Sequence, residues 1–313
     1  MFHLAQFIVL FCSTYVLVSG LSLDRSKIKD VPPSPKHVGI FDDEHDRKKI
    51  EEKMNKWKPE DDNYIWELSG LYEGDMMGIS KVGKNGILDV AKRWPDAVIP
   101  YHIEEDDFSE VQIEKIEKAL KVYHEKTCVR FRPYKKGDKD FIIVKGDSTG
   151  CWSYVGKHGE GQVVNFQNPG CLRPGTIIHE FMHALGFYHQ QSAADRDDWI
   201  TIVWDNITPG REHNFDKYDN KTVSDYGVTY DYGSVMHYSA KAFSKNGNFT
   251  ILCKKENVTL GQRDGFSEKD IKKVDAMYEK QCKARDKKEK GNSTILENII
   301  SSIWPFEGWF GVA

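Results

Sequence analysis

The sequence lacks an excess of charge of either sign, and it lacks internal repeats. Its 313 residues include 44 Lys and Arg against 48 Asp and Glu, which gives a formal net charge of −4. Nucleic-acid-binding domains usually carry a basic patch, so this balance gives no reason to expect a nucleic-acid partner. No segment recurs at a fixed period, which argues against a solenoid or a propeller.

Long hydrophobic runs are also missing. The apolar run from Leu4 to Val18 is shorter than the roughly 20 residues that cross a bilayer as a helix. It ends in Val18-Ser19-Gly20, a small-residue pattern typical of signal-peptide cleavage. Only His3 offers positive character before the run, so a retained anchor is the alternative interpretation. We predict that residues 1–20 are a signal peptide and that the protein is secreted and extracellular.

Cysteine is scarce, with six residues in the chain. Cys12 would leave with the signal peptide, and an oxidising compartment would then favour two disulfides and one unpaired thiol. The five remaining cysteines are Cys128, Cys151, Cys171, Cys253 and Cys282. Asn-x-Ser/Thr sequons predict a glycoprotein. They begin at Asn206, Asn220, Asn248, Asn257 and Asn292.

Aliphatic residues are few between residues 24 and 63, where charged residues are dense. Prolines interrupt this segment at Pro32, Pro33, Pro35 and Pro59. A segment of this composition buries too little apolar surface to form a core alone. Apolar and aromatic residues become frequent only after Tyr64. We predict that residues 21–84 are a propeptide ahead of a folded domain.

The first half of the folded part combines strand and helix patterns. Short apolar runs predict strands at residues 97–102, 141–144 and 162–166. Ser109, with Gln112 as its capping-box partner, predicts the start of a helix whose apolar residues recur at helical spacing. A second helix is expected at residues 175–185. These elements predict an α+β lobe with a mixed sheet and two long helices.

The second half is poor in such patterns. Residues 190–265 are rich in Asp, Asn, Gly, Ser and Thr, which predicts a mostly irregular lobe. Residues 266–278 predict a closing helix with Ser267 as N-cap. The charge run at 283–290 is interpreted as a solvated linker.

The last residues are apolar without forming a membrane span. Residues 295–313 are interrupted by Glu297, Pro305 and Glu307. An amphipathic docking helix and a disordered tail both remain open for this segment. We do not expect the tail at 283–313 to associate with a membrane.

One segment carries catalytic chemistry. His179 and His183 are four residues apart, so on a helix their rings share one face and can share one metal ion. Glu180 can reach a metal-bound water without being a ligand. Gly186 permits a left-handed turn that would bring His189 back to the same ion. Three imidazoles with an open fourth position are typical of a catalytic site with one Zn²⁺ per chain.

These residues resemble the astacin family of metzincin metalloendopeptidases. The run HEFMHALGFYHQQSAADRDDW, from His179 to Trp199, carries the resemblance. The segments SVMHY from Ser234, CVRF from Cys128 and CWSYVG from Cys151 match further landmarks of the family. The resemblance covers about residues 70–282 and implies a two-lobed, metzincin-type catalytic domain at residues 85–282.

The resemblance also implies roles for residues outside the zinc motif. Met236 would form the Met-turn beneath the three histidines. Tyr238 would ligate zinc at rest and swing aside to stabilise the oxyanion. The family pairs Cys128 with Cys282 and Cys151 with Cys171, which leaves the partner of Cys253 open.

The propeptide contains a second match to the family. Tyr72-Glu73-Gly74-Asp75 resembles its aromatic-x-Gly-Asp switch, in which the aspartate takes the place of water on zinc. The resemblance therefore implies a zymogen with Asp75 as the switch ligand. Cleavage after Lys84 by a trypsin-like activating protease would start the mature chain near Asn85.

Two positions depart from the family pattern. The family has Glu after the third histidine, where it pairs with the new amino terminus, and this chain has Gln190. Ala193 stands where the family has Arg. Neither change removes a ligand or the base, so we predict a zinc endopeptidase that hydrolyses protein or peptide substrates. Gln162–Phe166 is expected to be the edge strand on which a peptide docks.

Two alternatives come from other functional classes. The first is a secreted zinc-binding protein with little or no proteolytic activity, which Gln190 and Ala193 favour. The second makes the apolar tail the functional part, as an anchor to a membrane or matrix.

Overall fold

The computed structural model describes residues 44–61, 64–78, 89–219 and 224–303, with side chains described only between residues 47 and 295. The predicted signal peptide, the expected amino terminus near Asn85 and the sequon at Asn220 lie outside the described residues. The helices are α1 (Glu44–Lys56), α2 (Glu110–Lys126), α3 (Pro174–Leu185) and α4 (Glu268–Ile303). The strands are β1 (Met76–Met77), β2 (Val98–Ile103), β3 (Arg130–Pro133), β4 (Phe141–Lys145), β5 (Cys151–Tyr154), β6 (Gly161–Phe166), β7 (Ile200–Ile202) and β8 (Ile251–Cys253).

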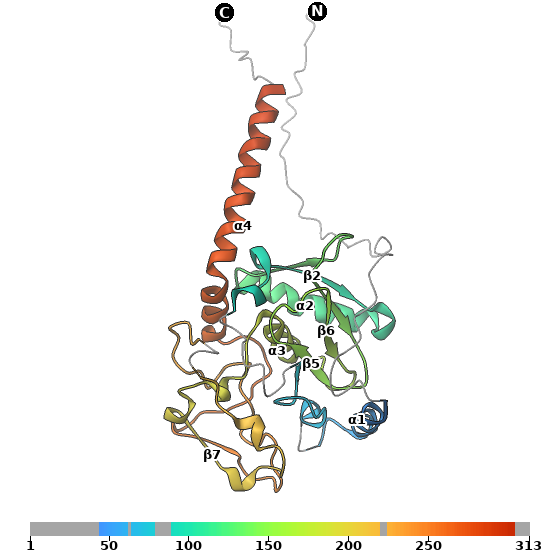
Figure 1. Ribbon diagram of the computed structural model, residues 1–313, viewed down its shortest axis with the longest axis vertical. Coiled ribbons are helices and arrows are strands. Elements are labelled where there is room, and N and C mark those ends of the chain that lie inside the picture. Colours follow the sequence, from blue (N-terminus) through green and yellow to red (C-terminus); the bar gives the residue numbers. More distant parts are fainter. Residues whose placement is uncertain (1–43, 62–63, 79–88, 220–223, 304–313) are drawn as a thin grey trace, which may run out of the picture. The chain divides into compact units, whose positions relative to one another are not determined.

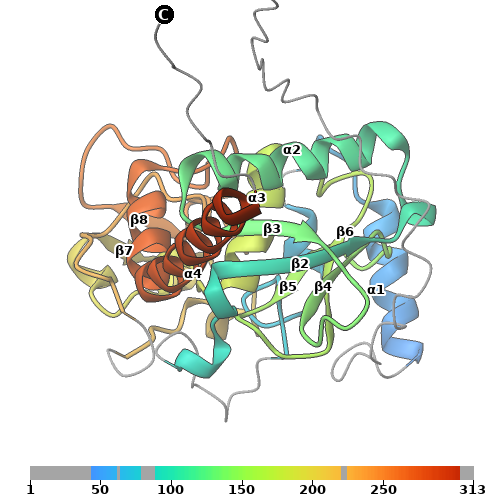
Figure 2. The ribbon, with the colours of Figure 1, turned by 90° about the horizontal axis from the view of Figure 1, so that it is seen from above.

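A six-stranded mixed sheet forms the first lobe (Figures 1 and 2). Its order is β1-β5-β6-β4-β2-β3, and every neighbouring pair is parallel except β5 with β6. The expected strands at 97–102, 141–144 and 162–166 are confirmed to within one residue at each end. The α+β prediction with a mixed sheet is therefore confirmed, although β3 and β5 were not expected as strands.

The expectation of an edge strand at Gln162–Phe166 was wrong. Strand β6 lies between β4 and β5, so both of its edges are paired. Strand β5 lies next to β6, and its other edge pairs with the outer strand β1, with Met76 opposite Ser153 and Met77 opposite Tyr154. Strand β6 is interior because β5, which precedes it in the chain, pairs with it antiparallel on the side away from β4.

Helix α2 forms where its cap and apolar spacing predicted. Gln112 accepts a hydrogen bond from the Ser109 backbone N–H, and the reciprocal bond of the capping box is also present. Its buried face consists of Ile113, Ile116, Ala119, Leu120 and Tyr123. The Tyr123 hydroxyl donates to the carbonyl of Ile178 at 2.6 Å, which ties α2 to α3.

The second lobe is mostly irregular, as predicted. Its strands β7 and β8 form a two-stranded antiparallel sheet, and short 3₁₀ helices join the loops. At the start of α4, the Asp270 N–H donates to the Ser267 hydroxyl, and the Ser267 N–H donates to the Asp270 carboxylate. This reciprocal pair confirms Ser267 as the cap of the closing helix.

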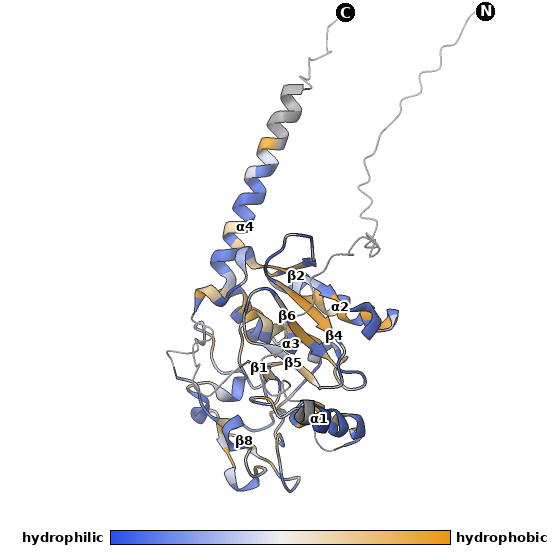
Figure 3. Cartoon of the chain, turned by 45° about the vertical axis from the view of Figure 1, so that its right-hand side comes forward, coloured by the Kyte–Doolittle hydropathy of each residue, from blue (hydrophilic) through white to orange (hydrophobic). Residues whose placement is uncertain are grey.

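Helix α4 continues far beyond the expected closing helix (Figure 1). The interpretation of residues 283–290 as a linker was wrong, because these residues are helical. They contain good helix formers with no Pro or Gly, and Lys283 pairs with Glu279 one turn earlier. Figure 3 shows that this part of α4 is largely hydrophilic, and no helix in the described part of the chain is long and apolar enough to cross a membrane.

The predicted propeptide contributes structure that its composition did not indicate. Helix α1 buries Ile50 and Met54, and Met54 lies under the backbone of Gly150 in the first lobe. The 3₁₀ turn at Ile65–Leu68 buries Trp66 against the second lobe. This segment therefore packs on the catalytic domain, consistent with its inability to form a core alone.

Both expected disulfides are present. Cys128 joins Cys282 across 154 residues, and Cys151 joins Cys171 across 20 residues. The first bridge fastens the closing helix to the end of α2. The neighbouring Arg285 side chain donates to the Cys128 carbonyl at 2.7 Å, which supports the same junction.

Removing the longer bridge is expected to weaken the fold strongly. A bridge that closes so long a loop restricts the unfolded chain, so replacing Cys128 and Cys282 by Ala should lower the free energy of unfolding by about 2–5 kcal/mol. Urea titrations followed by tryptophan fluorescence measure the change. Cys253→Ala is the matched control, because Cys253 is half-buried and forms no disulfide. Equal shifts for the two proteins would contradict the prediction.

Candidate metal centre and active site

Helix α3 and the turn after it bring three histidines together. His179 and His183 lie one turn apart on α3, with ring centroids 4.7 Å apart. Gly186 ends the helix in the left-handed conformation, with φ 113°. The chain then reverses, and the ring of His189 comes within 4.8 Å of the ring of His183. The turn expected at Gly186 is confirmed.

The Nε2 atoms of the three imidazoles face the carboxylate of Asp75. One oxygen of Asp75 lies 3.1 Å from Nε2 of His179 and 3.2 Å from Nε2 of His189, and the other lies 3.4 Å from Nε2 of His183. The four ligand atoms lie within 4.8 Å of one another, and all four side chains are buried.

The chemistry of this cluster fits one zinc ion. Three imidazole nitrogens and a carboxylate oxygen are a donor set that zinc prefers. Nε2 of His183 and Oδ1 of Asp75 are buried without a hydrogen-bond partner among the described residues, which is unusual unless an ion completes the site. Burial and the charge of Arg263 lower the pKa of His179 well below its usual value. Burial also opposes the charged form of His189, but Asp75 and Glu73 outweigh it and raise the pKa of His189 to about 9. A metal ligand must be neutral, so metal binding at this cluster would release protons.

Each imidazole is also held through its other nitrogen. The Nδ1–H of His179 donates to the carbonyl of Val235 at 2.8 Å, and that of His183 donates to the carbonyl of Phe187 at 2.7 Å. These bonds leave each Nε2 free for the metal, as outer partners of ligating histidines usually do. Nδ1 of His189 instead contacts a carboxylate oxygen of Glu73 at 2.7 Å.

Glu180 lies beside the cluster without joining it. Its side chain is buried, and Oε2 has no hydrogen-bond partner among the described residues. Burial, followed by the charge of Asp75, raises the pKa of Glu180 well above its usual value. Burial opposes ionisation of Asp75 as well, but the facing imidazoles outweigh it and hold the pKa of Asp75 well below its usual value. A carboxyl group that holds a proton more readily than usual therefore lies next to the candidate metal ligands.

The sequence profile of the Astacin family of peptidases matches residues 86–279. The chain belongs to the astacin family. It is 44% identical over 206 residues to zinc metalloproteinase nas-13 of Caenorhabditis elegans, covering 66% of this chain and 45% of that protein. It is 39% identical over 270 residues to meprin A subunit beta of Rattus norvegicus, covering 85% of this chain and 34% of that protein.

A solved astacin-family structure matches the same region. High choriolytic enzyme 1, a hatching enzyme zinc-protease from Oryzias latipes, aligns with a TM-score of 0.56 at 35% identity. The alignment covers 66% of this chain and 99% of that chain. The chain spans about half the length of nas-13 and of further curated relatives, between 42% and 55%. It therefore contains an astacin zinc metalloendopeptidase domain with the metzincin-type fold.

The residue expected to form the Met-turn lies next to the histidine cluster. Met236 is buried, and its carbonyl accepts a hydrogen bond from the N–H of Gln190 at 2.9 Å. Gln190 directly follows the ligand His189, and Val235 before Met236 accepts the bond from His179. The turn thereby fixes two of the three histidines relative to each other.

The ring of Tyr238 contacts the metal cluster, with its centroid 4.7 Å from that of His189. Its hydroxyl donates to the carbonyl of Glu73 at 2.6 Å instead of to a member of the cluster, and its ring is tilted against that of Trp66 at a centroid distance of 5.1 Å. This differs from the resting position that the astacin resemblance implies. The reason is local: Asp75 faces the three histidines, and the adjoining carbonyl of the predicted propeptide offers the phenol an acceptor.

Asp75 reaches the site through a tight hairpin of the predicted propeptide. The Gly74 N–H donates to the Leu71 carbonyl, and the Met76 N–H donates to the Tyr72 carbonyl. Gly74 has φ 91°, and a Cβ there would lie 2.6 Å from Trp66. A side chain at this position would clash with Trp66, so Gly74 permits the close packing of the hairpin in this astacin domain.

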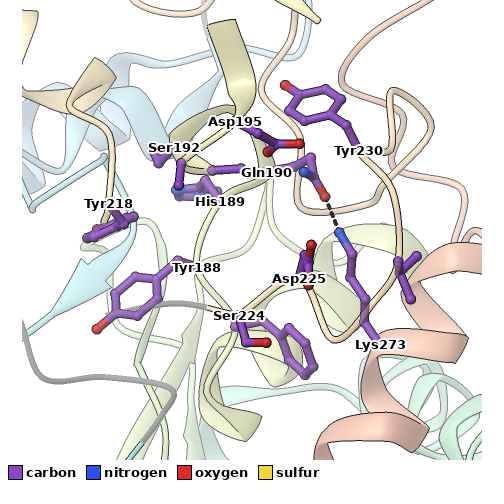
Figure 4. Close-up of a pocket in the computed structure, with 14 residues that line it drawn as sticks. Tyr188, His189, Gln190, Ser192, Asp195, Tyr218, Ser224, Asp225, Tyr230 and Lys273 are labelled. Carbon is purple, nitrogen blue, oxygen red and sulfur yellow. Dashed lines mark hydrogen bonds between the residues drawn. The ribbon is translucent and has the colours of Figure 1, made fainter. Parts of the chain in front are cut away.

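The departure at Gln190 is accommodated by a lysine of α4. Lys273 donates to the Gln190 side-chain oxygen, and both line a cavity of about 460 Å³ together with Ala193 (Figure 4). Burial lowers the pKa of Lys273. The cavity is therefore lined by a lysine side chain that faces the neutral amide of Gln190.

Restoring a carboxylate at this position is expected to stabilise the astacin domain. Gln190→Glu would replace a neutral acceptor of Lys273 by a charged one, which strengthens such a hydrogen bond by about 1 kcal/mol. Thermal unfolding of the unprocessed chain measures the gain. In a Lys273→Met background the same substitution should lose its benefit, since its partner is absent. An equal gain in both backgrounds would contradict this assignment.

The sequons differ in accessibility. Asn248, Asn257 and Asn292 are exposed, and Asn292 lies on α4. Asn206 is half-buried, and its Nδ2 donates to the Phe249 carbonyl at 2.8 Å. The Asn206 side chain is less accessible and already bonded, so the three exposed sites are the better acceptors.

The sequence did not predict a role for two buried residues near the site. Glu73 was treated as the variable position of the switch motif, although it contacts His189 directly. Arg263 is buried and donates to the His237 carbonyl at 3.1 Å, which supports the backbone just before Tyr238. No local sequence pattern distinguishes Arg263. For Glu73, the only signal was that a second carboxylate lies two residues before Asp75.

Proposed function

We propose that this protein is a secreted zinc endopeptidase made as a zymogen. The convergence of three imidazole Nε2 atoms on the carboxylate of Asp75 carries this proposal. His179, His183 and His189 would hold the zinc. The carboxylate of Asp75 would occupy the site until the propeptide at residues 21–84 is removed.

The catalytic groups act around the peptide bond to be cut. When bound, zinc polarises the scissile carbonyl and lowers the pKa of water to about 7. Glu180 takes the proton of the attacking water and returns it to the leaving amine. Tyr238 leaves the Glu73 carbonyl after processing, and its hydroxyl then donates to the developing oxyanion.

The substrate adds to the edge of β5 that β1 occupies in this structure. Strand β1 of the propeptide pairs with this edge at Ser153 and Tyr154. Its removal exposes unpaired backbone groups beside the metal ligands, and an extended peptide can bind there by β-addition. This position replaces the docking strand expected at Gln162–Phe166.

Activation requires cleavage between Asp75 and β2. A trypsin-like protease acting after Lys84 supplies it. Two disulfides and exposed sequons support an extracellular, glycosylated protein. The substrates are proteins or peptides.

The test is proteolysis by the secreted chain with and without activation. Residues 21–313 are produced with their disulfides, treated with trypsin and incubated with a peptide library. Activity that appears after trypsin and disappears with a chelator is the expected result. A processed protein that holds one zinc and cuts nothing favours the second candidate, a non-proteolytic zinc-binding protein, which Gln190 motivates.

A further inference from the structure

The three metal-binding imidazoles differ in which segment of the chain supplies the hydrogen-bond partner of Nδ1, the nitrogen that faces away from the metal. Two of them donate to backbone carbonyls of the catalytic domain. The third, His189, contacts the carboxylate of Glu73, which belongs to the segment expected to be removed. No described residue other than Glu73 contacts Nδ1 of His189 within hydrogen-bond distance. Processing therefore removes the outer partner of one ligand only.

Glu73 is held firmly in this position. Its side chain is 0% exposed, and its second oxygen accepts bonds from the hydroxyls of Tyr218 at 2.8 Å and Ser192 at 3.2 Å. Its N–H donates to the side chain of Asn214 at 3.0 Å. Figure 4 shows Tyr218, Ser192 and His189 on the same side of the cavity. A buried glutamate with these bonds has a defined partner for each oxygen.

The backbone accepts an uncommon conformation at this residue. Glu73 has φ 48°, in the left-handed region that side chains other than Gly rarely adopt. With Gly74 also at positive φ, the hairpin turns the carboxylates of Glu73 and Asp75 into one site. Such a conformation persists only when the surrounding contacts determine it. The contacts that do so here are the three side-chain bonds and the bond from Tyr238 to the Glu73 carbonyl.

We propose that Glu73 is a positioning residue of the zymogen's metal site: by accepting the Nδ1–H of His189, it orients this ligand until the propeptide is removed. The inference rests on the proposed function in two respects, that His189 binds zinc and that processing removes the segment that contains Glu73. Outer carboxylates fix the tautomer of a ligating histidine and raise its basicity. The propeptide therefore both blocks the metal and strengthens its binding, and the site loses this support on processing.

The test is the rate at which the unprocessed chain releases zinc to an excess of a chromogenic chelator. Loss of an outer partner typically weakens metal binding about 10- to 100-fold, so Glu73→Ala should release zinc faster by about that factor. Glu73→Gln keeps one acceptor oxygen but loses the charge, and its rate should lie between those of Glu73→Ala and the parent chain. Glu67→Gln is the matched control, because Glu67 is also a buried propeptide glutamate but accepts its bond from the N–H of Phe243, away from the ligands.

The design separates this inference from the proposed function and from misfolding. After cleavage behind Lys84, all variants yield the same mature chain, so equal zinc release by the processed proteins verifies that each catalytic domain folded. Zinc release within twofold of the parent chain for both Glu73 variants would overturn the inference. Faster release in Glu73→Ala alongside processed proteins that cut no peptide would support the inference and reject the peptidase.

Discussion

Glu180→Gln is expected to lower kcat of the processed enzyme by about 10²- to 10⁴-fold, the usual contribution of a general base. The amide retains the shape of the side chain but cannot take a proton from water. Zinc content should be unchanged, because Glu180 is not among the groups that converge on the site. Stability should not fall, since Oε2 of Glu180 has no partner among the described residues and burial already disfavours its charged form.

Zinc analysis, thermal unfolding and hydrolysis of a quenched fluorescent peptide check the three statements together. Glu256→Gln is the matched control, because Glu256 is exposed on the surface. Hydrolysis by Glu180→Gln within tenfold of the parent rate, at full zinc content, would reject Glu180 as the base. Loss of zinc together with activity would instead assign it a structural role.

Asp75→Ala is expected to give the unprocessed chain a basal activity that the parent zymogen lacks. The substitution removes the carboxylate that faces the three imidazoles, so the fourth metal position becomes open to water. We expect the rate of hydrolysis of a small peptide to be at least tenfold above that of the parent zymogen. The reason is that each 1.4 kcal/mol of binding free energy lost by the blocking carboxylate changes the equilibrium by about a factor of ten. The rate should stay below that of the processed enzyme, because β1 still pairs with the edge of β5.

The comparison requires that the chain remains uncut, which gel electrophoresis of each reaction verifies. Glu60→Ala is the control, since Glu60 is an exposed acidic residue of the same propeptide. An uncut Asp75→Ala chain with no activity above the parent would contradict the switch, provided that trypsin treatment then yields a fully active enzyme. A result of this kind would indicate that β1 and Trp66, rather than the carboxylate of Asp75, keep the zymogen inactive.

Local sequence patterns predicted much of the first lobe and the core of the metal site. The four-residue spacing of His179 and His183 needs only a helix to place both rings on one face, and Gly186 needs only its own freedom at positive φ to turn the chain. The capping box at Ser109 is equally local. These features depend on residues within about two helical turns of one another, so they can be derived from spacing alone.

The predictions from the sequence were wrong where the structure depends on contacts between residues far apart in the chain. The linker expected at 283–290 is helical, because a hydrophilic charge run can continue a helix that is already fixed at Cys282. The edge strand expected at Gln162–Phe166 lies inside the sheet, because strand order in space is not encoded in any one strand. Helix α1 was not expected, because its apolar face is small and becomes buried only against the catalytic domain.

The sequence by itself determined the family, the fold class and the three histidines with their neighbouring glutamate. Only the tertiary structure brought Glu73 to His189, 116 residues away, and Lys273 to Gln190, 83 residues away. It also turned Tyr238 toward the propeptide. The physical reason is that a hydrogen bond between distant segments depends on how the whole chain packs, whereas a ligand spacing on one helix depends only on the helix.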